Sequence, residues 1–261
     1  MRYVTSRLID YSRFKPYASA RKTDAITGNT YTGCLFILVR NSMSYLPAVE
    51  VVTATPPDAT VIWLHGLGAN GHDFEPLVPA LHLPRQAAIR FLFPHAPAIP
   101  VTINSGYVMP AWYDILEMTL DRRVDVQQLV ASAASIHALI DREIERGIAS
   151  ERIVIAGFSQ GGAVAYQAAL TYPKPLGGLL ALSTYFTTAD SIQPHAANQH
   201  LPIQIFHGTH DSIVPEFLGF KAHRLLMEKG YRPGYATYAM EHSVCEEQVA
   251  DISEYLQDWL L

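Results

Sequence analysis

Two hydrophobic patterns alternate along most of the chain. Short, β-branched runs such as Thr60–Leu64 and Ile153–Ala156 are typical of strands buried on both faces of a parallel sheet. Longer segments, among them 124–146 and 246–261, have the pattern of helices. We therefore predict an α/β fold with a mainly parallel sheet and helices on both faces. Its strands are expected near Thr60, Ala88, Arg152, Gly177, Pro202 and Tyr235.

Two residues mark predicted helix boundaries. Pro173 ends a helix expected over Gly162–Tyr172, because proline cannot continue a helix. Asp73 precedes the segment Phe74–Leu81, where an aspartate is a good helix cap.

The strand at Ile153–Ala156 runs into Gly157-Phe-Ser-Gln-Gly161 and directly on into a helix. This is the nucleophile-elbow pattern of serine hydrolases, in which the serine occupies a strained turn between strand and helix. Gly157 and Gly161 flank Ser159, where the chain folds back on both sides and only small residues fit. A serine in an ordinary tight turn would show the same pattern, so the prediction depends on its partners.

A serine hydroxyl needs an imidazole to take its proton and a carboxylate to orient that imidazole. Asp211 follows a predicted strand that begins at Pro202, and His242 follows another that begins near Tyr235. The order serine, aspartate, histidine is that of α/β hydrolases. Taken singly, Asp211 is also compatible with a turn residue and His242 with a surface histidine.

The tetrahedral intermediate also needs hydrogen-bond donors directed at its oxygen. The glycine-rich segment His65–Gly71 follows the strand at Thr60–Leu64, and Gln160 follows the serine. We predict that the backbone amides of Leu67 and Gln160 form this oxyanion hole. The alternative is that the glycines only make a turn.

Five motifs carry a family resemblance: His65–Gly71, Ala111–Ile115, Gly157–Gly162, His207–Asp211 and His242–Cys245. Through these motifs, residues 46–261 resemble the phospholipase/carboxylesterase family, which includes acyl-protein thioesterases. The stretch 100–114 resembles most closely the small bacterial carboxylesterases of that family. The resemblance implies an α/β-hydrolase fold and a serine carboxylesterase that acts on short- to medium-chain acyl esters. Acyl-protein thioesters and lysophospholipids are alternative substrates.

The long segment between Pro94 and Asp121 is unusually apolar. Long loops in compact domains are usually functional or disordered, and this one is too hydrophobic for disorder. We predict that it lines an acyl groove, with Trp112 and Phe158 as substrate-binding residues and Leu67 at the mouth. The alternative for most of its side chains is ordinary core packing.

Composition limits the partners. The 261 residues are 49% hydrophobic and carry a formal charge of −5, which suits one sizeable domain and argues against nucleic-acid binding. Two cysteines do not suggest a disulfide framework, so we expect a cytoplasmic protein. No cofactor is required, and His207, His210, Asp211 and His242 lack the pattern of a metal site. The expected partner is a small-molecule acyl ester or thioester, and the apolar end Trp259–Leu261 leaves a homodimer open.

Two other functions fit the same motifs. An acyltransferase would pass the acyl group to an alcohol or amine instead of water. A catalytically silent binding module would keep the fold, but it would be expected to have lost part of the triad or of the oxyanion hole.

Residues 1–43 carry no catalytic motif and are rich in basic side chains. The apolar run Tyr31–Val39 is too short to span a bilayer, so no stable membrane insertion is expected. We predict two parts, an N-terminal extension (1–43) and a catalytic domain (44–261). The hypothesis is that Met43 is the genuine start and that the earlier residues are a poorly ordered extension or an upstream-start artefact. The rival is an arginine-rich targeting or membrane-associating arm. Peptides from Tyr3–Arg40 in the native protein would contradict the hypothesis.

Overall fold

The computed structural model describes residues 45–118 and 122–261, and a seven-stranded sheet forms its centre. The strand order is β1-β3-β2-β8-β9-β10-β11; β1 is antiparallel to β3 and the other neighbours are parallel. The predicted mainly parallel α/β architecture is confirmed. The strands are β1 (Ala48–Val52), β2 (Ala59–Leu64), β3 (Ile89–Pro94), β8 (Ile153–Phe158), β9 (Gly178–Leu182), β10 (Ile203–Gly208) and β11 (Gly234–Tyr238).

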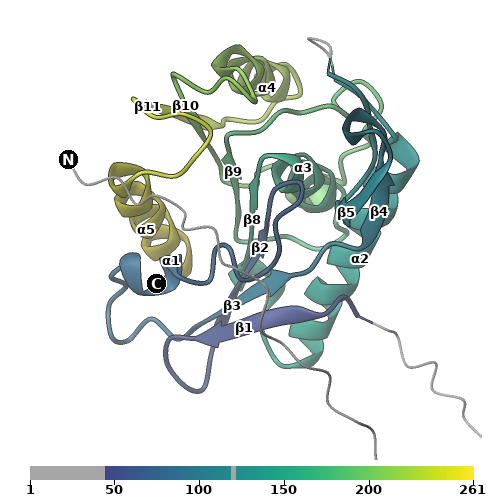
Figure 1. The fold of residues 1–261 in the computed structure, drawn as a ribbon. Coiled ribbons are helices and arrows are strands. Elements are labelled where there is room, and N and C mark those ends of the chain that lie inside the picture. Colours follow the sequence, from purple (N-terminus) through teal and green to yellow (C-terminus); the bar gives the residue numbers. More distant parts are fainter. Residues whose placement is uncertain (1–44, 119–121) are drawn as a thin grey trace, which may run out of the picture. The chain divides into compact units, whose positions relative to one another are not determined.

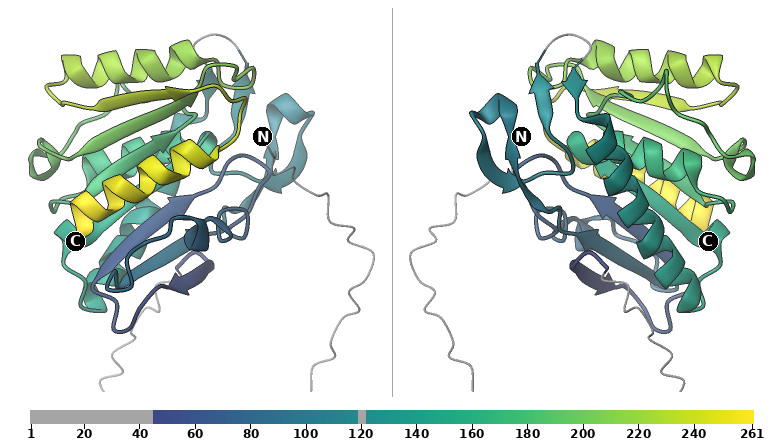
Figure 2. Two further views of the ribbon diagram at one scale, coloured as in Figure 1. Left: turned by 90° about the vertical axis from the view of Figure 1, so that its left-hand side faces the viewer. Right: turned by 90° about the vertical axis from the view of Figure 1, so that its right-hand side faces the viewer.

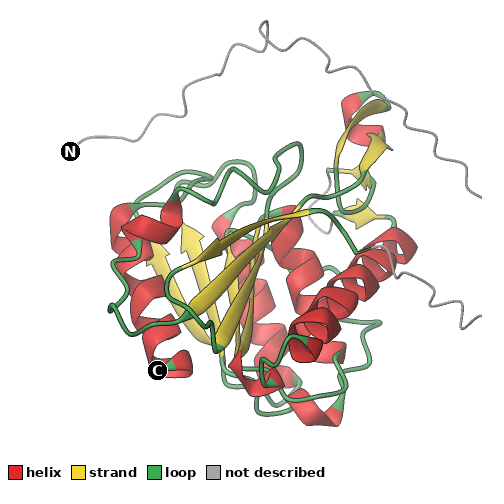
Figure 3. Ribbon diagram, turned by 90° about the horizontal axis from the view of Figure 1, so that it is seen from below, coloured by secondary structure: helices red, strands yellow, loops and turns green. Residues whose placement is uncertain are grey.

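Helices cover both faces of this sheet (Figure 1). Helices α2 (Val126–Glu145), α3 (Gln160–Thr171) and α4 (Glu216–Glu228) contribute side chains to one hydrophobic core. Helices α1 (Leu77–Ala80) and α5 (Glu246–Leu260) pack into the other. Figure 3 shows the strands as a twisted layer between the helices. The central strands β2, β8 and β10 are almost fully buried because both faces are covered.

Two small hairpins occupy the segment that we expected to be a loop. One pairs β4 (Ala98–Val101) with β5 (Tyr107–Pro110), and the other pairs β6 (Ile115–Glu117) with β7 (Arg123–Val124). The β4–β5 hairpin projects from the body of the domain (Figure 2). Prolines within both β4 and β5 weaken the strand signal in the sequence, because proline cannot donate to a ladder.

The prediction for Asp73 is wrong. Its carboxylate accepts a hydrogen bond from the amide of Asn70 (2.5 Å) and so closes a turn, while α1 begins only at Leu77, after Pro76. Helix α3 ends at Thr171, one residue before the predicted end at Tyr172. Strand β1 and helix α4 were not predicted.

The structure describes the C-terminal end of the chain but not the N-terminal end. The predicted N-terminal extension (1–43) lies outside the described residues. At the C-terminus, Leu260 is buried and Trp259 packs against Gly178, so only Leu261 of the predicted interface segment is largely exposed. Among the helices of residues 45–118 and 122–261, none has the length and apolar character needed to cross a bilayer.

Candidate active site

All predicted catalytic residues lie where strands of the parallel sheet end. Ser159 follows β8, Asp211 lies beyond β10, His242 beyond β11, and Leu67 in the loop after β2. Because these strands are parallel, their carboxyl ends meet at one edge of the sheet (Figure 1). The topology therefore brings together residues that are far apart in the sequence.

Ser159 has the geometry of a nucleophile elbow. Its φ of 54° and ψ of −120° are costly for a residue with a side chain, by about 1–3 kcal/mol. A Cβ atom added to Gly157 would lie 2.5 Å from the carbonyl oxygen of Gly161, and one added to Gly161 would lie 2.5 Å from that of His65. The flanking glycines are thus required by close backbone contacts. The Thr184 hydroxyl donates to the Ser159 carbonyl (2.5 Å) and supports the turn.

Asp211 is held for interaction with His242. Nδ1 of His242 donates to Oδ2 of Asp211 (2.6 Å), while the amides of Ile213 and Val214 donate to Oδ1 at 2.9 and 2.7 Å. Burial alone would raise the pKa of Asp211, but the hydrogen bonds from His242 and Val214 outweigh it, so the pKa is lowered. Asp211 is therefore ionised at neutral pH and fixes the orientation of the imidazole.

His242 packs against Phe158, the residue directly before the serine. The rings of Phe158 and His242 are 4.6 Å apart between centroids, and Ser159 is the next residue in the chain. Among the described residues, the hydroxyl of Ser159 has no hydrogen-bond partner. Catalytic hydrogen bonds are often completed only when substrate is bound.

The predicted oxyanion donors are available. Within residues 45–118 and 122–261, the amides of Leu67 and Gln160 have no acceptor. The next amide, that of Gly68, donates to the carbonyl of Pro110 in β5 (2.8 Å) and so ties the loop to the hairpin. Gln160 also begins α3, whose N-terminal end favours negative charge.

His65 supports, from inside the protein, the loop 65–71 that carries the predicted oxyanion donor Leu67 and is called the oxyanion loop below. Its Nδ1 lies 2.7 Å from the carbonyl of Gly66, and its Nε2 accepts from the amide of Ala96 (3.1 Å). These partners require a neutral ring with the proton on Nδ1. Burial lowers the pKa of His65, which favours this neutral form. Through these contacts, His65 braces the loop.

Trp112 also supports the oxyanion loop. It is only 1% exposed, and its indole N–H donates to the carbonyl of His65 (2.8 Å). The side-chain amide of Gln160 accepts from the Trp112 amide (2.9 Å) and donates to the Tyr113 carbonyl (2.7 Å). The sequence did not show this bracing, because it depends on contacts between distant segments.

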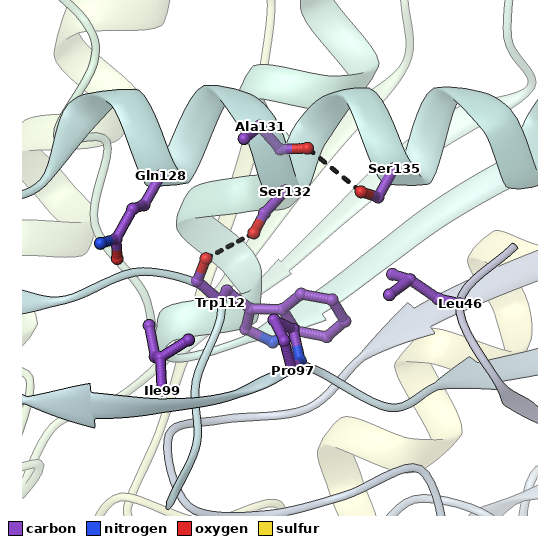
Figure 4. A pocket seen from close by; sticks show the side chains of 8 residues that line it. All are labelled: Leu46, Pro97, Ile99, Trp112, Gln128, Ala131, Ser132 and Ser135. Atoms are coloured by element: carbon purple, nitrogen blue, oxygen red, sulfur yellow. Dashed lines mark hydrogen bonds between the residues drawn. The ribbon is translucent and has the colours of Figure 1, made fainter. Parts of the chain in front are cut away.

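A cavity of about 190 Å³ lies on the α2 side of Trp112, between α2 and β4 (Figure 4). The hydroxyl of Ser132 in α2 donates to the Trp112 carbonyl there. The lining contains no predicted triad or oxyanion residue. The role of Trp112 as an acyl-groove residue thus stays a prediction. Phe158, the other predicted substrate-binding residue, packs against His242. The cavity is lined by Leu46, Pro97, Ile99, Trp112, Gln128, Ala131, Ser132 and Ser135.

His207 has a structural role that the sequence did not show. It is fully buried, and its Nε2 donates to the carbonyl of Val214 (2.8 Å), next to the amide that binds Asp211. Burial lowers its pKa. In the described part of the chain, no group of three histidine, cysteine or acidic side chains is arranged to hold a metal ion.

Comparisons with known proteins agree on one family. A profile described as phospholipase/carboxylesterase matches residues 47–260. Acyl-protein thioesterase 1 of Gibberella zeae is 38% identical over 79% of this chain and 93% of its own length. Acyl-protein thioesterase 1 of Neurospora crassa is 38% identical over 84% of this chain and 94% of its own. The crystal structure of Zea mays acyl-protein thioesterase 2 superimposes with a TM-score of 0.73 at 25% identity, covering 83% of this chain and all of that one.

Proposed function

Because the chain belongs to the phospholipase/carboxylesterase family of α/β hydrolases, we propose that it is a serine hydrolase that cleaves acyl thioesters, with acylated protein cysteines as the substrate class. It is thus a hydrolase by family. The sequence alone favoured a carboxylesterase for short- to medium-chain esters, with thioesters as the alternative. Relatives named acyl-protein thioesterase at 38% identity favour that alternative.

The observation that carries the proposal is the hydrogen bond between His242 and Asp211 beside the serine elbow. In the proposed mechanism, Nε2 of His242 removes the proton from Ser159, whose oxygen attacks the acyl carbonyl carbon. Asp211 stays ionised and stabilises the imidazolium that forms. The amides of Leu67 and Gln160 donate to the oxyanion of the tetrahedral intermediate.

The leaving group then departs and the acyl-enzyme is hydrolysed. A cysteine thiol has a pKa near 8.5, far below that of an alcohol, so a thiolate leaves with little need of a proton. An alkoxide must take the proton from His242 as it leaves, whereas a thiolate can take it from His242 after departure; either way His242 becomes neutral again. In the second half of the reaction, His242 takes a proton from water as the hydroxide attacks the acyl carbonyl. It then returns this proton to the Ser159 oxygen as the bond to the acyl group breaks and the acid leaves.

Apolar surface for the acyl chain lies next to the oxyanion loop. The sulfur of Met109 in β5 is 3.8 Å from where a Cβ on Gly68 would lie, and Leu67 is only partly buried. These side chains support an acyl group as the part of the substrate that is recognised.

A matched pair of substrates tests the proposal. Octanoylated peptides that differ only in a thioester to cysteine or an oxygen ester to serine would be hydrolysed by the purified protein, with Ser159→Ala as the control. The proposal predicts a larger kcat/KM for the thioester and no turnover by the variant. Hydrolysis of the oxygen ester alone would restore the carboxylesterase interpretation.

A further inference from the structure

Arg122 is a buried cation outside the catalytic machinery described so far. It lies just before β7, with a φ of 45°, and it is only 6% exposed. In the described part of the chain, no carboxylate pairs with it and its Nε has no partner. Burial of a guanidinium without an ion-pair partner is costly, so its remaining contacts need an explanation.

Those contacts lead to the loop that carries Asp211. One Nη of Arg122 donates to the carbonyl of Ile213, and the other contacts the sulfur of Met118 (3.1 Å). The guanidinium carbon lies 4.9 Å above the centre of the Tyr185 ring, a cation–π arrangement. The side chain therefore joins the β6–β7 hairpin to the loop 211–214.

The carbonyl that Arg122 holds belongs to a peptide unit that also binds Asp211. The C=O of Ile213 and the N–H of Val214 are parts of one planar peptide group and point in opposite directions. That N–H donates to Oδ1 of Asp211 at 2.7 Å. A donor on the carbonyl fixes the plane of the peptide, and a cationic donor also polarises it, which strengthens its N–H as a donor.

From this geometry we propose that Arg122 is a positioning residue for the catalytic acid. It acts through the Ile213–Val214 peptide on Oδ1 of Asp211, and so on the hydrogen bond between Oδ2 and His242. His207 holds the carbonyl of Val214 on the other side, which leaves this short loop braced at two successive carbonyls. The inference rests on the proposed triad, since it assigns to Arg122 a role in orienting Asp211.

The test compares neighbouring arginines. Arg122→Met removes the donor and keeps an unbranched side chain, and Arg122→Lys keeps a cationic donor. Arg123→Met is the matched control, because Arg123 lies on the same hairpin and pairs only with exposed Glu117 among the described residues. Thermal unfolding of each variant shows whether the fold is retained. If Arg122→Met does not fold, the kinetic and NMR comparisons are made with Arg122→Lys instead.

The expected result for Arg122→Met is a kcat lower by about 10- to 100-fold on the octanoyl thioester, with KM changed less than about 2-fold. Arg122→Lys is expected to recover part of kcat, and Arg123→Met to match the wild type. An unchanged kcat in Arg122→Met, a loss confined to KM, or an equal loss in Arg123→Met would overturn the proposal.

A second readout does not depend on turnover. The low-field proton NMR signal of His242 Nδ1–H, assigned with a His242→Ala variant, reports on its bond to Asp211. We expect this signal to shift or broaden in Arg122→Met and to stay unchanged in Arg123→Met; an unchanged signal in both overturns the proposal. Absence of wild-type thioester hydrolysis would count against the proposed function, while the NMR comparison would still decide the role of Arg122.

Discussion

The indole N–H of Trp112 and the carbonyl of His65 form a 2.8 Å hydrogen bond beneath the oxyanion loop. Because Trp112 is buried, this bond makes it a support for the loop. The amide of Trp112 is in turn held by the side chain of Gln160, whose own amide is a predicted oxyanion donor. Both sides of the predicted oxyanion hole are therefore linked through one tryptophan.

Trp112→Phe should lower kcat to a similar extent for short and long acyl substrates. The substitution keeps an aromatic ring and removes only the donor, which leaves the buried His65 carbonyl unsatisfied at a cost of about 1–3 kcal/mol. Kinetics on acetyl to dodecanoyl thioesters measures this directly. A loss that grows with chain length, chiefly in KM, would instead place Trp112 in the acyl groove.

Asp211→Asn should lower kcat by about four orders of magnitude with little change in KM. An amide in place of the carboxylate no longer stabilises the imidazolium and favours the wrong histidine tautomer. Steady-state kinetics checks this, and circular dichroism confirms that the fold is intact. A loss of less than tenfold would mean that another group orients His242.

The stability of the protein should fall as the pH drops below about 6.5. Burial lowers the pKa values of His65 and His207, so the unfolded chain binds protons at these sites before the native protein does. Each site contributes at most about 1.4 kcal/mol per pH unit, in the window between its native pKa and 6.5. Urea unfolding at pH 7.5 and pH 5 measures the difference.

The control for this pH effect is a pair of histidine variants. His207→Gln should reduce the loss of unfolding free energy between pH 7.5 and pH 5. His200→Gln should leave it unchanged, because His200 is exposed. Identical pH dependence in the wild type and His207→Gln would show that His207 is not held neutral by burial.

Gly161→Ala should destabilise the protein by about 3 kcal/mol and abolish activity. The added Cβ would lie 2.5 Å from the His65 carbonyl and 2.6 Å from that of Leu64, and neither backbone atom can move without disturbing the oxyanion loop. Denaturant unfolding checks the magnitude. Gly147→Ala is the comparison, since its Cβ would meet nothing within 4 Å and only its φ of 95° is unfavourable. Equal effects at the two glycines would exclude the steric explanation.

The fold brings the predicted catalytic residues to one edge of the sheet, and this could be expected because their signals are local. Ser159, Asp211 and His242 each follow a hydrophobic run that reads as a strand, and the rule that parallel strands end at one edge places them together. The central strands were predictable for the same reason, since burial on both faces makes their sequences almost wholly apolar.

The supporting contacts could not be predicted because they join distant segments. Arg122 reads as one of two adjacent hydrophilic arginines, and nothing local shows that its side chain is buried against residue 213. Trp112 is apolar whether it lines a groove or packs in a core, and its hydrogen bond to the distant His65 carbonyl leaves no local signal in the sequence. Asp73 has the sequence of a helix cap, but Pro76 delays the helix until Leu77.

Trapping the acyl group on Ser159 tests most directly whether this serine is the nucleophile. The purified protein would be mixed rapidly with octanoyl thioester, quenched in acid and analysed by peptide mass spectrometry, alongside Ser159→Ala and a fluorophosphonate-labelled sample. We expect an octanoyl adduct and probe labelling on Ser159 in the wild type, and neither adduct nor turnover in the folded variant. Undiminished thioester hydrolysis by Ser159→Ala would contradict this role of Ser159.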